Sequence, residues 1–289
     1  MLARWRRAAS HISNLRLGKN PMGSSQRSFL FDRNYAKVAA SQSSPKPSIP
    51  MLQPTKPEVR LNALFWSKPC SLALAPNSPL RIEEPQYAGI RHFILKLMLF
   101  YSKQSKSIRG ANVVYRRIIS QVDKPAVYDV FQLEKTFKTT FALLVLHMWL
   151  FLRRMKEEGK EGVEFGQYLY EIYNHDLELR VSKAGVNLLL TKWMKELEKI
   201  FYGNIIAYDA ALTPEAKNDD LANVLWRNVF SEDGSAMSDP AAATAVQAMA
   251  RYTRRESTCL SMTEREALFS GNFMFTSLGK QLPNQVKAT

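Results

Sequence analysis

Residues 141–152 constrain the fold of this chain more than any other stretch, because His147 is the only polar residue among them. Two cations, Arg153 and Arg154, follow directly. A helix of twelve to fourteen residues rises about 1.5 Å per residue and covers roughly 20 Å, short of the ~30 Å hydrocarbon core of a bilayer. A helix that is apolar on nearly every side, yet too short to span, is typical of the centre of a helical domain. We therefore expect a buried central helix; a re-entrant or membrane-surface segment is the alternative.

The composition allows one sizeable core. The chain has 289 residues, of which 46% are hydrophobic, and a chain of this length can bury a large apolar interior. The formal charge is +14, but residues 1–57 supply +9 of it, since they carry ten Lys or Arg and one acid, Asp32. The two cysteines, Cys70 and Cys259, lie far apart and have no Cys or His at ligand spacing, so neither a zinc site nor a disulfide framework is predicted.

Residues 1–35 have the composition of a mitochondrial presequence. They are rich in Arg and Ser, and on a helix their apolar side chains gather near one side: Leu2, Trp5, Ala9, Ile12 and Leu15. A cationic amphipathic head poor in acids is typical of mitochondrial targeting, whereas a secretory signal needs an unbroken apolar stretch. The tetrapeptide Arg-Asn-Tyr-Ala at residues 33–36 resembles a plant-type processing site, so we expect cleavage after Tyr35. A disordered basic tail and a chloroplast address are the alternatives.

Residues 36–86 predict a Pro-rich linker that is mostly disordered. Nine prolines occur from Pro45 to Pro85, and each fixes φ and removes a backbone donor. Within this linker, only residues 61–66 are expected to dock locally. At the other end of the chain, residues 257–289 predict a loosely ordered C-terminal tail.

Residues 87–256 predict an all-α fold, a single compact domain of about seven helices. Strand-like alternation and hairpin dipeptides are scarce there. The clearest apolar stripe at helical spacing consists of Val186, Leu189, Leu190, Trp193, Leu197, Ile200 and Phe201. The helices are expected near residues 87–104, 108–121, 129–156, 163–181, 186–211, 214–230 and 239–256. Thr213 and Pro214 read as the N-cap and first residue of one of them.

Patterns that carry chemistry are missing from the sequence. It contains no GxGxxG, GxxxxGK[ST], CxxC, HExxH or GxSxG pattern. His147 lies in the apolar helix without a carboxylate beside it in sequence. We expect a core histidine bonded to a backbone or side-chain group; a catalytic or haem-ligating role is the alternative. We therefore predict no catalytic residue, no metal site and no cofactor, and the chain is not expected to be an enzyme.

Asp176 and Arg180 predict a structural ion pair. Asp176 falls within or beside an apolar helical stripe, and Arg180 follows four residues later. That offset places two side chains next to each other on a helix. Because an unpaired, partly buried carboxylate is costly, we expect Arg180 to pair with it. A polar contact with a partner protein is the alternative.

Three groups of arginines are candidates for a basic contact surface. They are Arg116 with Arg117, Arg153 with Arg154, and Arg251 with Arg254 and Arg255. Together they would suit ribosomal RNA or anionic lipid. The alternative is a set of solvated helix ends, where the dipole favours cations. No signature of an RNA-binding module is present.

Four blocks of sequence occur in a particular order. They are FALLVLHMWLFLRRM at residues 141–155, YLYEIYNHDLELR at 168–180, KWMK at 192–195 and FYGNIIAYDAAL at 201–212. By their order and spacing they resemble the ubiquinol–cytochrome c chaperone family, the assembly factors of respiratory complex III. The resemblance extends over roughly residues 87–255.

The resemblance implies an all-helical, cofactor-free chaperone that lies at the matrix side of the mitochondrial inner membrane, in peripheral contact with it. Such proteins bind newly made cytochrome b together with a small helical partner protein. In some lineages they sit at the exit tunnel of the mitochondrial ribosome. We expect these partners, and no DNA, for this chain.

The chaperone hypothesis requires an apolar binding surface. Met148, Trp149, Met155 and Tyr173 are the candidate lining of a groove for client or partner, because methionine adapts to varied apolar partners. Burial of these residues in the core is the alternative. A mitochondrial RNA-binding translation factor acting on cytochrome b expression is the alternative function, and an integral membrane protein is a further competing class.

Overall fold

The structure is a computed structural model that describes residues 61–85, 87–185, 189–231, 237 and 239–278. Across these residues the chain forms nine α-helices and two short helical turns, without a β-strand. One isolated bridge pairs Ala73 with Phe273. This confirms the all-α prediction. The predicted presequence, the cleavage site after Tyr35 and residues 36–60 of the linker lie outside the described residues.

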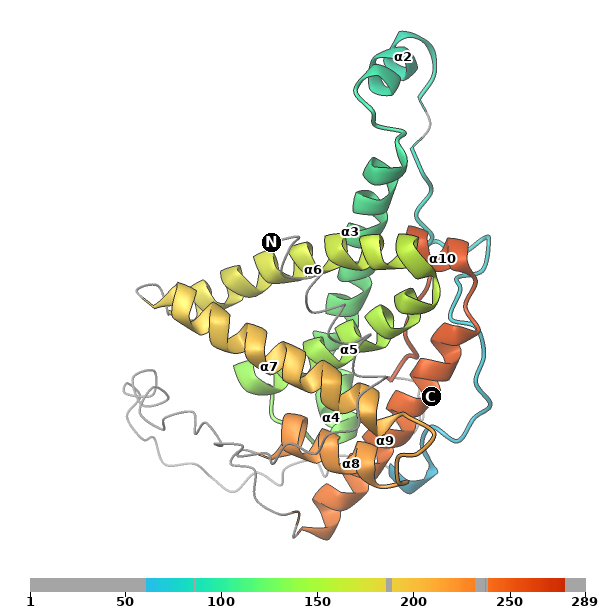
Figure 1. The fold of residues 1–289 in the computed structure, drawn as a ribbon. Helices are drawn as coiled ribbons and strands as arrows, with labels where there is room; N and C mark the ends of the chain where they lie inside the picture. The colour runs from blue at the N-terminus through green and yellow to red at the C-terminus, as the bar shows by residue number, and fades with distance from the viewer. Residues whose placement is uncertain (1–60, 86, 186–188, 232–236, 238, 279–289) are drawn as a thin grey trace, which may run out of the picture.

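The helices enclose one central element. In chain order the elements are η1 (Leu61–Ala63), α2 (Gly89–Leu97), α3 (Lys103–Val122), α4 (Pro125–Phe131), α5 (Phe137–Glu157), α6 (Gly159–Lys183), α7 (Leu190–Ala211), α8 (Asp220–Leu225), the π-helical turn η2 (Trp226–Phe230), α9 (Pro240–Ser261) and α10 (Arg265–Ser270). Figure 1 shows α6 and α7 as the arms of a V with α5 between them. Helices α3, α6, α7 and α9 all pack against α5, whereas α2 stands away from the body at one end.

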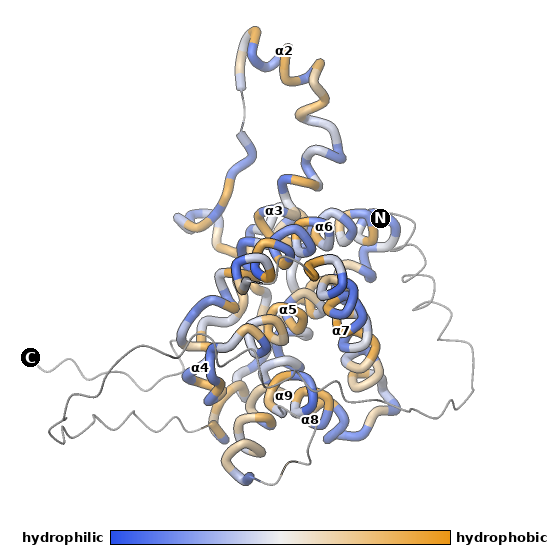
Figure 2. Tube along the Cα trace, turned by 90° about the vertical axis from the view of Figure 1, so that its left-hand side faces the viewer, coloured by the Kyte–Doolittle hydropathy of each residue, from blue (hydrophilic) through white to orange (hydrophobic). Residues whose placement is uncertain are grey.

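The apolar run forms the buried centre of the body, as its pattern predicts. Every residue from Phe141 to Leu152 is buried in α5, and the orange α5 tube runs through the middle of Figure 2. The helix begins at a capping box, in which Thr136 and Thr139 bond each other's backbone N–H groups. In the described part of the chain, no helix is both long and apolar enough to cross a membrane.

The expected helix over residues 129–156 is two helices. Helix α4 ends at Phe131, because Gln132 takes the left-handed conformation with φ 55°, which ends helices in general. The chain restarts as α5 at the Thr136 cap. The sequence hides this break, since both helices bury their apolar residues in the same core.

The helix expected from Pro214 begins later, at Asp220. Thr213 and Ala216 are joined by a backbone hydrogen bond of 3.1 Å, which makes residues 213–216 a turn. Pro214 occupies the second position of this turn, where its fixed φ fits as well as it would at a helix start. A Thr-Pro pair, which often begins a helix, therefore forms a turn at this position.

The structure corrects the predicted domain boundaries at both ends. In the linker, Leu61, Leu64, Phe65 and Leu72 are buried, so part of residues 61–85 belongs to the core. At the other end, α9 continues to Ser261 and is followed by α10. Further buried residues lie in the expected tail, namely Phe273, Phe275 and Leu278. The two ends hold each other, because Leu74 N–H donates to the Asn272 carbonyl at 2.9 Å.

Candidate functional site

An open pocket lies where the end of α3, the start of α5 and the second half of α6 meet. Its volume is about 350 Å³, and Phe137, Phe141, Leu144 and Leu177 provide its apolar lining. The Phe137 and Phe141 rings are stacked, with centroids 6.4 Å apart. Phe137 is 38% exposed, whereas the three residues behind it are buried. The volume is near the lower end of the ~300–1,000 Å³ usual for ligand sites.

Charged side chains line the rim of this pocket. Arg180 Nε donates to Asp176 Oδ2 across 2.6 Å, and Arg180 Nη2 lies 3.8 Å from Asp123 Oδ2. The Tyr115 hydroxyl donates to the same Asp176 oxygen across 2.8 Å. Lys135 Nζ donates to the backbone carbonyl of Asp123 across 3.3 Å. The predicted Asp176–Arg180 ion pair is thus present, and Arg180 and Asp123 themselves line the pocket.

Tyr115 and Arg180 at the rim keep their ordinary protonation states at neutral pH. Burial raises the pKa of Tyr115, and its hydrogen bond to Asp176 raises it further, so the hydroxyl remains a donor. Burial lowers the pKa of Arg180, but the hydrogen bond and charge of Asp176 outweigh it and leave the pKa raised. The pocket therefore combines an apolar wall with a fixed cation. Because Arg180 is already paired with Asp176 and Asp123, such a site suits an apolar side chain with a polar neighbour.

The four residues predicted to line a groove do not form one. Met148, Trp149, Met155 and Tyr173 are each at most 1% exposed. The Trp149 indole N–H donates to Asp209 Oδ1 at 2.8 Å, which points the ring into the junction of α5 and α7. The groove assignment is corrected, because side chains inside the body cannot touch a client while the chain is folded.

Among the pocket residues, the sequence points to a site role for Arg180 alone, as the partner of Asp176. Phe137 and Phe141 carry a signal that could have found them, since two aromatic residues four apart straddle the start of the apolar run. The first turn of a helix that enters a core is where an aromatic side chain is only half covered. The contributions of Asp123 and Leu177 had no such signal, because they come from other helices.

The arginines on α5 bind partners within the chain. Arg153 Nη1 lies 3.4 Å from Asp209 Oδ1, beside the Lys156 pair with Oδ2 at 2.8 Å. Arg154 Nε donates to the Leu260 carbonyl at 3.1 Å. These contacts join the end of α5 to α7 and α9. Arg153 and Arg154 therefore stabilise the packing of these helices.

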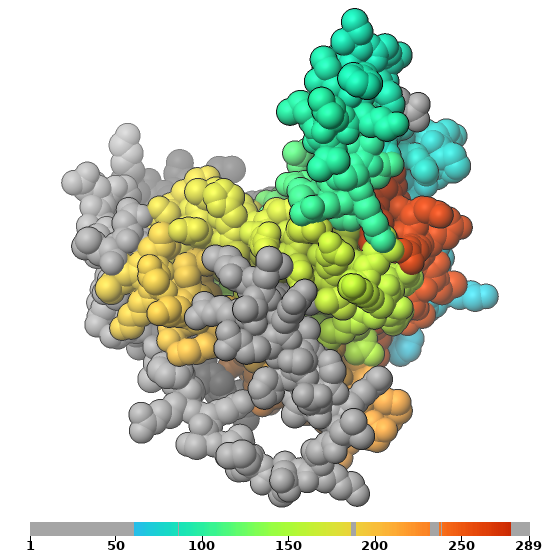
Figure 3. Space-filling model, turned by 45° about the horizontal axis from the view of Figure 1, so that its top comes forward, coloured from blue at the N-terminus to red at the C-terminus, as the bar shows by residue number. Residues whose placement is uncertain are grey.

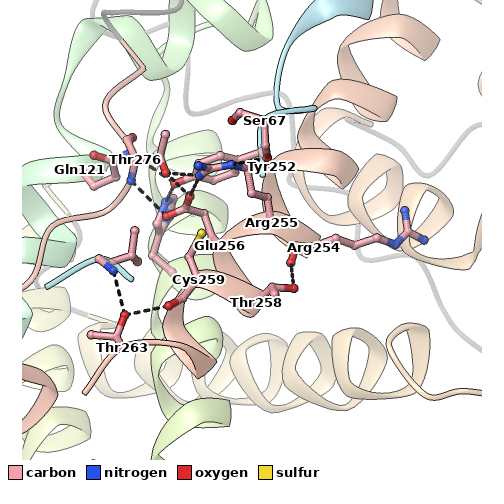
Figure 4. Close-up of polar contacts among 12 residues, drawn as sticks. Ser67, Gln121, Tyr252, Arg254, Arg255, Glu256, Thr258, Cys259, Thr263 and Thr276 are labelled. Atoms are coloured by element: carbon pink, nitrogen blue, oxygen red, sulfur yellow. Dashed lines mark hydrogen bonds and ion pairs between the residues drawn. The ribbon is translucent and has the colours of Figure 1, made fainter. Parts of the chain in front are cut away.

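Two of the three arginines on α9, Arg251 and Arg255, contact the segment that precedes α2. Arg251 donates to the carbonyls of Leu61 and Leu64 at 2.7 and 3.1 Å. Figure 4 shows Arg255 turned toward Glu256 and Thr276, while Arg254 points away from them. Arg254 donates instead to the Asn218 carbonyl at 2.7 Å.

Glu256 is fully buried beside Arg255. Burial raises its pKa, and the Thr276 donors and Arg255 act against that rise. Arg255 Nη1 lies 3.2 Å from Glu256 Oε1, and the Thr276 N–H donates to Oε2 at 3.1 Å. The Glu256 carboxylate therefore has hydrogen-bond and ion-pair partners inside the protein, and it links the chain after α10 to α9.

The third pair of arginines lies on α3. Arg117 Nε donates to the Gly271 carbonyl at 3.1 Å, whereas Arg116 is exposed. Most of the seven arginines thus serve contacts inside the body. Binding of ribosomal RNA or anionic lipid by them stays a prediction.

His147 is a buried histidine with both ring nitrogens bonded. Its Nδ1–H donates to the Leu143 carbonyl at 2.7 Å, and the Tyr252 hydroxyl donates to Nε2 at 2.9 Å. Burial lowers the pKa of His147 to about 4. Gln121 Nε2 lies 3.3 Å from the same hydroxyl. The residue is therefore a neutral core histidine at pH 7.

The described residues show neither a metal-binding cluster nor a His or Cys in the pocket lining. Among them, no group of three or more His, Cys, Asp or Glu side chains is placed to hold a metal ion. The pocket lining contains neither His nor Cys, the side chains that most often act as base or nucleophile.

Comparison with known proteins decides the family. Residues 129–275, about half of the chain, match the ubiquinol-cytochrome C chaperone family. The chain belongs to this family. Of the nine residues that line the pocket, all but Asp123 lie within the matched span.

Individual relatives agree with the family. Ubiquinol-cytochrome c reductase complex assembly factor 1 of Homo sapiens is 27% identical over 236 residues, which cover 79% of this chain and 75% of that protein. The protein of the same name from Mus musculus is also 27% identical, over 65% of this chain and 61% of its own length. The chain thus spans about three fifths of the mouse relative.

A more distant relative and a solved structure extend the comparison. Protein CBP3, mitochondrial, of Saccharomyces cerevisiae is 28% identical over 53% of this chain and 44% of its own length. The crystal structure of the Cbp3 homolog from Brucella abortus aligns with a TM-score of 0.54 at 27% identity. It covers 65% of this chain and 98% of the bacterial chain.

Proposed function

We propose that this chain is a mitochondrial assembly factor of respiratory complex III that binds newly synthesised cytochrome b. It does so with a small helical partner protein, near the mitochondrial ribosome and at the matrix side of the inner membrane. Family membership carries the proposal, together with the names of the relatives, which are assembly factors of ubiquinol-cytochrome c reductase. The proposal gives the chain no catalytic step.

The pocket beside Phe137 is the proposed contact for the client. Its apolar wall takes a large apolar side chain, and Arg180 and Lys135 face the polar group beside it. A hydrophobic segment that leaves the ribosome before its neighbouring subunits are present exposes such side chains. Covering them in a preformed recess follows the logic of helix-in-groove recognition.

The test is isolation of the tagged chain from mitochondria that translate with labelled methionine. Labelled cytochrome b is expected to co-purify above the level seen with an unrelated matrix protein, and RNase treatment is expected to leave its recovery unchanged. The Phe137→Asp variant places a charge on the apolar wall and is expected to lower recovery at least about tenfold.

The matched control is Met262→Asp, because Met262 is 51% exposed and lies outside the pocket. It is expected to recover cytochrome b like the parent chain. No enrichment of cytochrome b would contradict the proposal. Direct RNA affinity that falls steeply with salt, without cytochrome b, would point to the translation factor instead.

A further inference from the structure

Helix α2 exposes an apolar face that the rest of the described chain leaves uncovered. None of its nine residues is buried. Around it lie the most exposed large apolar side chains of the structure apart from Trp66: Ile90 at 80%, Leu97 at 77%, Met98 at 72%, Phe93 at 69% and Leu99 at 66%. Single exposed apolar residues are ordinary on protein surfaces, but a cluster of this size marks a binding surface.

The exposed side chains share one side of the helix. At about 100° per residue, Ile90, Phe93, Ile94 and Leu97 fall within one arc. Arg91 and Lys96 fall on opposite flanks of that arc. An apolar face bordered by long cations is the arrangement of a helix that lies in the plane of a membrane interface, with the charged groups reaching to the headgroups.

The charged residues in the sequence between Glu84 and Asp123 are all basic. No Asp or Glu occurs between Glu84 and Asp123, whereas seven Lys or Arg do. Lys106 and Arg109 pair with Glu84 at 3.0 and 2.9 Å at the base of the protrusion. Arg91 and Lys96 are exposed at its tip, where Arg91 lies over the Tyr87 ring. A partner for this face must therefore tolerate or attract positive charge.

The base of the protrusion is fastened to the body. Arg109 donates to the Phe100 carbonyl at 2.8 Å and lies over the Phe100 ring at 4.1 Å. Tyr87 packs edge-on against the same ring at 6.2 Å. Tyr87, which precedes α2, and Phe100, which follows it, are thus held in contact. Figures 2 and 3 show the result, a prominence formed by α2 and the start of α3. At its foot, Lys103 of α3 pairs with Glu161 of α6 at 3.1 Å.

We propose that α2 is a docking helix for an anionic membrane surface, with its apolar face in the lipid and Arg91 and Lys96 at the headgroups. The charge decides for lipid over a second protein, since the apolar face has cations on both flanks and no acid. α2 also precedes the span matched by the family. The inference deepens the proposed function and rests on it for the identity of the membrane, namely the inner membrane of mitochondria.

A fluorescent reporter on α2 tests this directly in the full chain. Cys70 is exposed and Cys259 is buried, so a Cys70→Ser chain carrying Leu97→Cys takes an environment-sensitive dye at one place. Vesicles of phosphatidylcholine are compared with vesicles that also contain phosphatidylglycerol. The dye is expected to shift to the blue on the anionic vesicles, with affinity at least about fivefold higher than on neutral ones and lowered by salt.

Residues 1–57 carry a net charge of +9 and would be drawn to anionic vesicles by charge. Reporters at other positions distinguish their effect from that of α2. The dye at Lys195→Cys on α7 is expected to show no shift, and the dye at His92→Cys, on the polar side of α2, a smaller one than at Leu97. The pair Ile90→Ser with Phe93→Ser is expected to abolish the shift at residue 97. The control pair, Leu179→Ser with Met262→Ser, removes apolar side chains that are 46% and 51% exposed and is expected to leave it intact.

Several results would overturn the proposal. They are an absent blue shift on anionic vesicles, a shift that survives Ile90→Ser with Phe93→Ser, and a shift that appears without vesicles as protein concentration rises, which would assign α2 to a second copy. Because α2 carries no buried residue, these variants are expected to keep the thermal melt of the parent. Co-isolation of cytochrome b in detergent is expected to be unchanged, so failure here is distinct from failure of the proposed function.

Discussion

Asp209 shows at the residue scale how a single side chain joins two helices. It accepts from Trp149 at 2.8 Å, Lys156 at 2.8 Å and Arg153 at 3.4 Å, all of them on α5. The Trp149 indole lies in the core and has to find its acceptor there. This arrangement explains why two of the predicted surface or groove residues, Trp149 and Arg153, belong to the fold.

Replacing Asp209 tests that role. Asp209→Ala leaves the Trp149 N–H without its acceptor and is expected to lower the free energy of unfolding by about 2–3 kcal/mol in urea titration. Asp209→Asn keeps an oxygen in place and is expected to cost less. Glu196→Ala is the control, because its pair with Lys199 is exposed, and a loss of at most about 0.5 kcal/mol is expected. Equal losses for Asp209→Ala and Glu196→Ala would contradict this account.

His147 makes stability depend on pH. Its pKa is lowered by burial from 6.5 to about 4, so between these values the unfolded chain binds a proton that the folded chain does not. The free energy of unfolding therefore falls as pH drops through this window, by up to about 3 kcal/mol from this residue. His147→Gln is expected to be less stable at pH 7 but to lose less on acidification.

The comparison is between slopes of unfolding free energy against pH, measured by urea titration. His92→Gln serves as the control, since His92 is exposed, and its slope is expected to match that of the parent chain. A His147→Gln slope equal to the parent's would show that another group carries the acid sensitivity.

At the element scale, the segment before α2 is part of the body. Phe65 is 7% exposed and packs against Phe131 and Tyr252, with ring centroids 5.9 and 5.3 Å away. Phe65→Ala is therefore expected to lower the free energy of unfolding by about 3–4 kcal/mol. The neighbouring Trp66 is 71% exposed, and Trp66→Ala is expected to cost less than about 1 kcal/mol. Chemical unfolding that ranks the two the other way round would show that the segment does not dock as described.

Two helical glycines give a second matched pair. A Cβ on Gly110 would overlap the backbone carbonyl of Phe269, where α3 crosses α10, whereas a Cβ on Gly203 in α7 meets nothing within 4 Å. Gly110→Ala is expected to destabilise by at least about 2 kcal/mol. Gly203→Ala is expected to stabilise by about 0.5–1 kcal/mol, because alanine favours the helix. Thermal melts of the two variants that move in the same direction would contradict the close packing of α3 on α10.

The elements differ in how well the sequence predicts them. The burial of α5 follows from its pattern alone, because twelve nearly unbroken apolar residues that cannot span a membrane have only a protein interior to enter. The break at Gln132 does not follow, since glutamine has no special preference for a left-handed conformation. The exposure of α2 does not follow either. Helical periodicity shows that a face needs an apolar neighbour, without showing whether the same chain supplies it.

At the scale of the whole molecule, the candidate site is assembled from distant parts. Phe137, Leu177 and Asp123 come from α5, α6 and the end of α3, and no local pattern links them. The Asp176–Arg180 contact could be predicted because it lies within one helix turn of α6. Whether Met148 and Trp149 line a groove could not be predicted, because methionine or tryptophan at helical spacing gives the same sequence pattern in a core and at a binding surface.

The whole molecule is a helical body from which α2 projects (Figure 1). A pocket lies at the start of its buried central helix, α5. Photo-crosslinking tests directly whether the pocket receives newly made cytochrome b, as we propose. A benzophenone amino acid is placed at residue 137, or at residue 262 as the control, in mitochondria that translate with labelled methionine. A labelled cytochrome b adduct from residue 137, well above that from residue 262, is the predicted result. No such adduct, or equal adducts from both positions, would contradict the account.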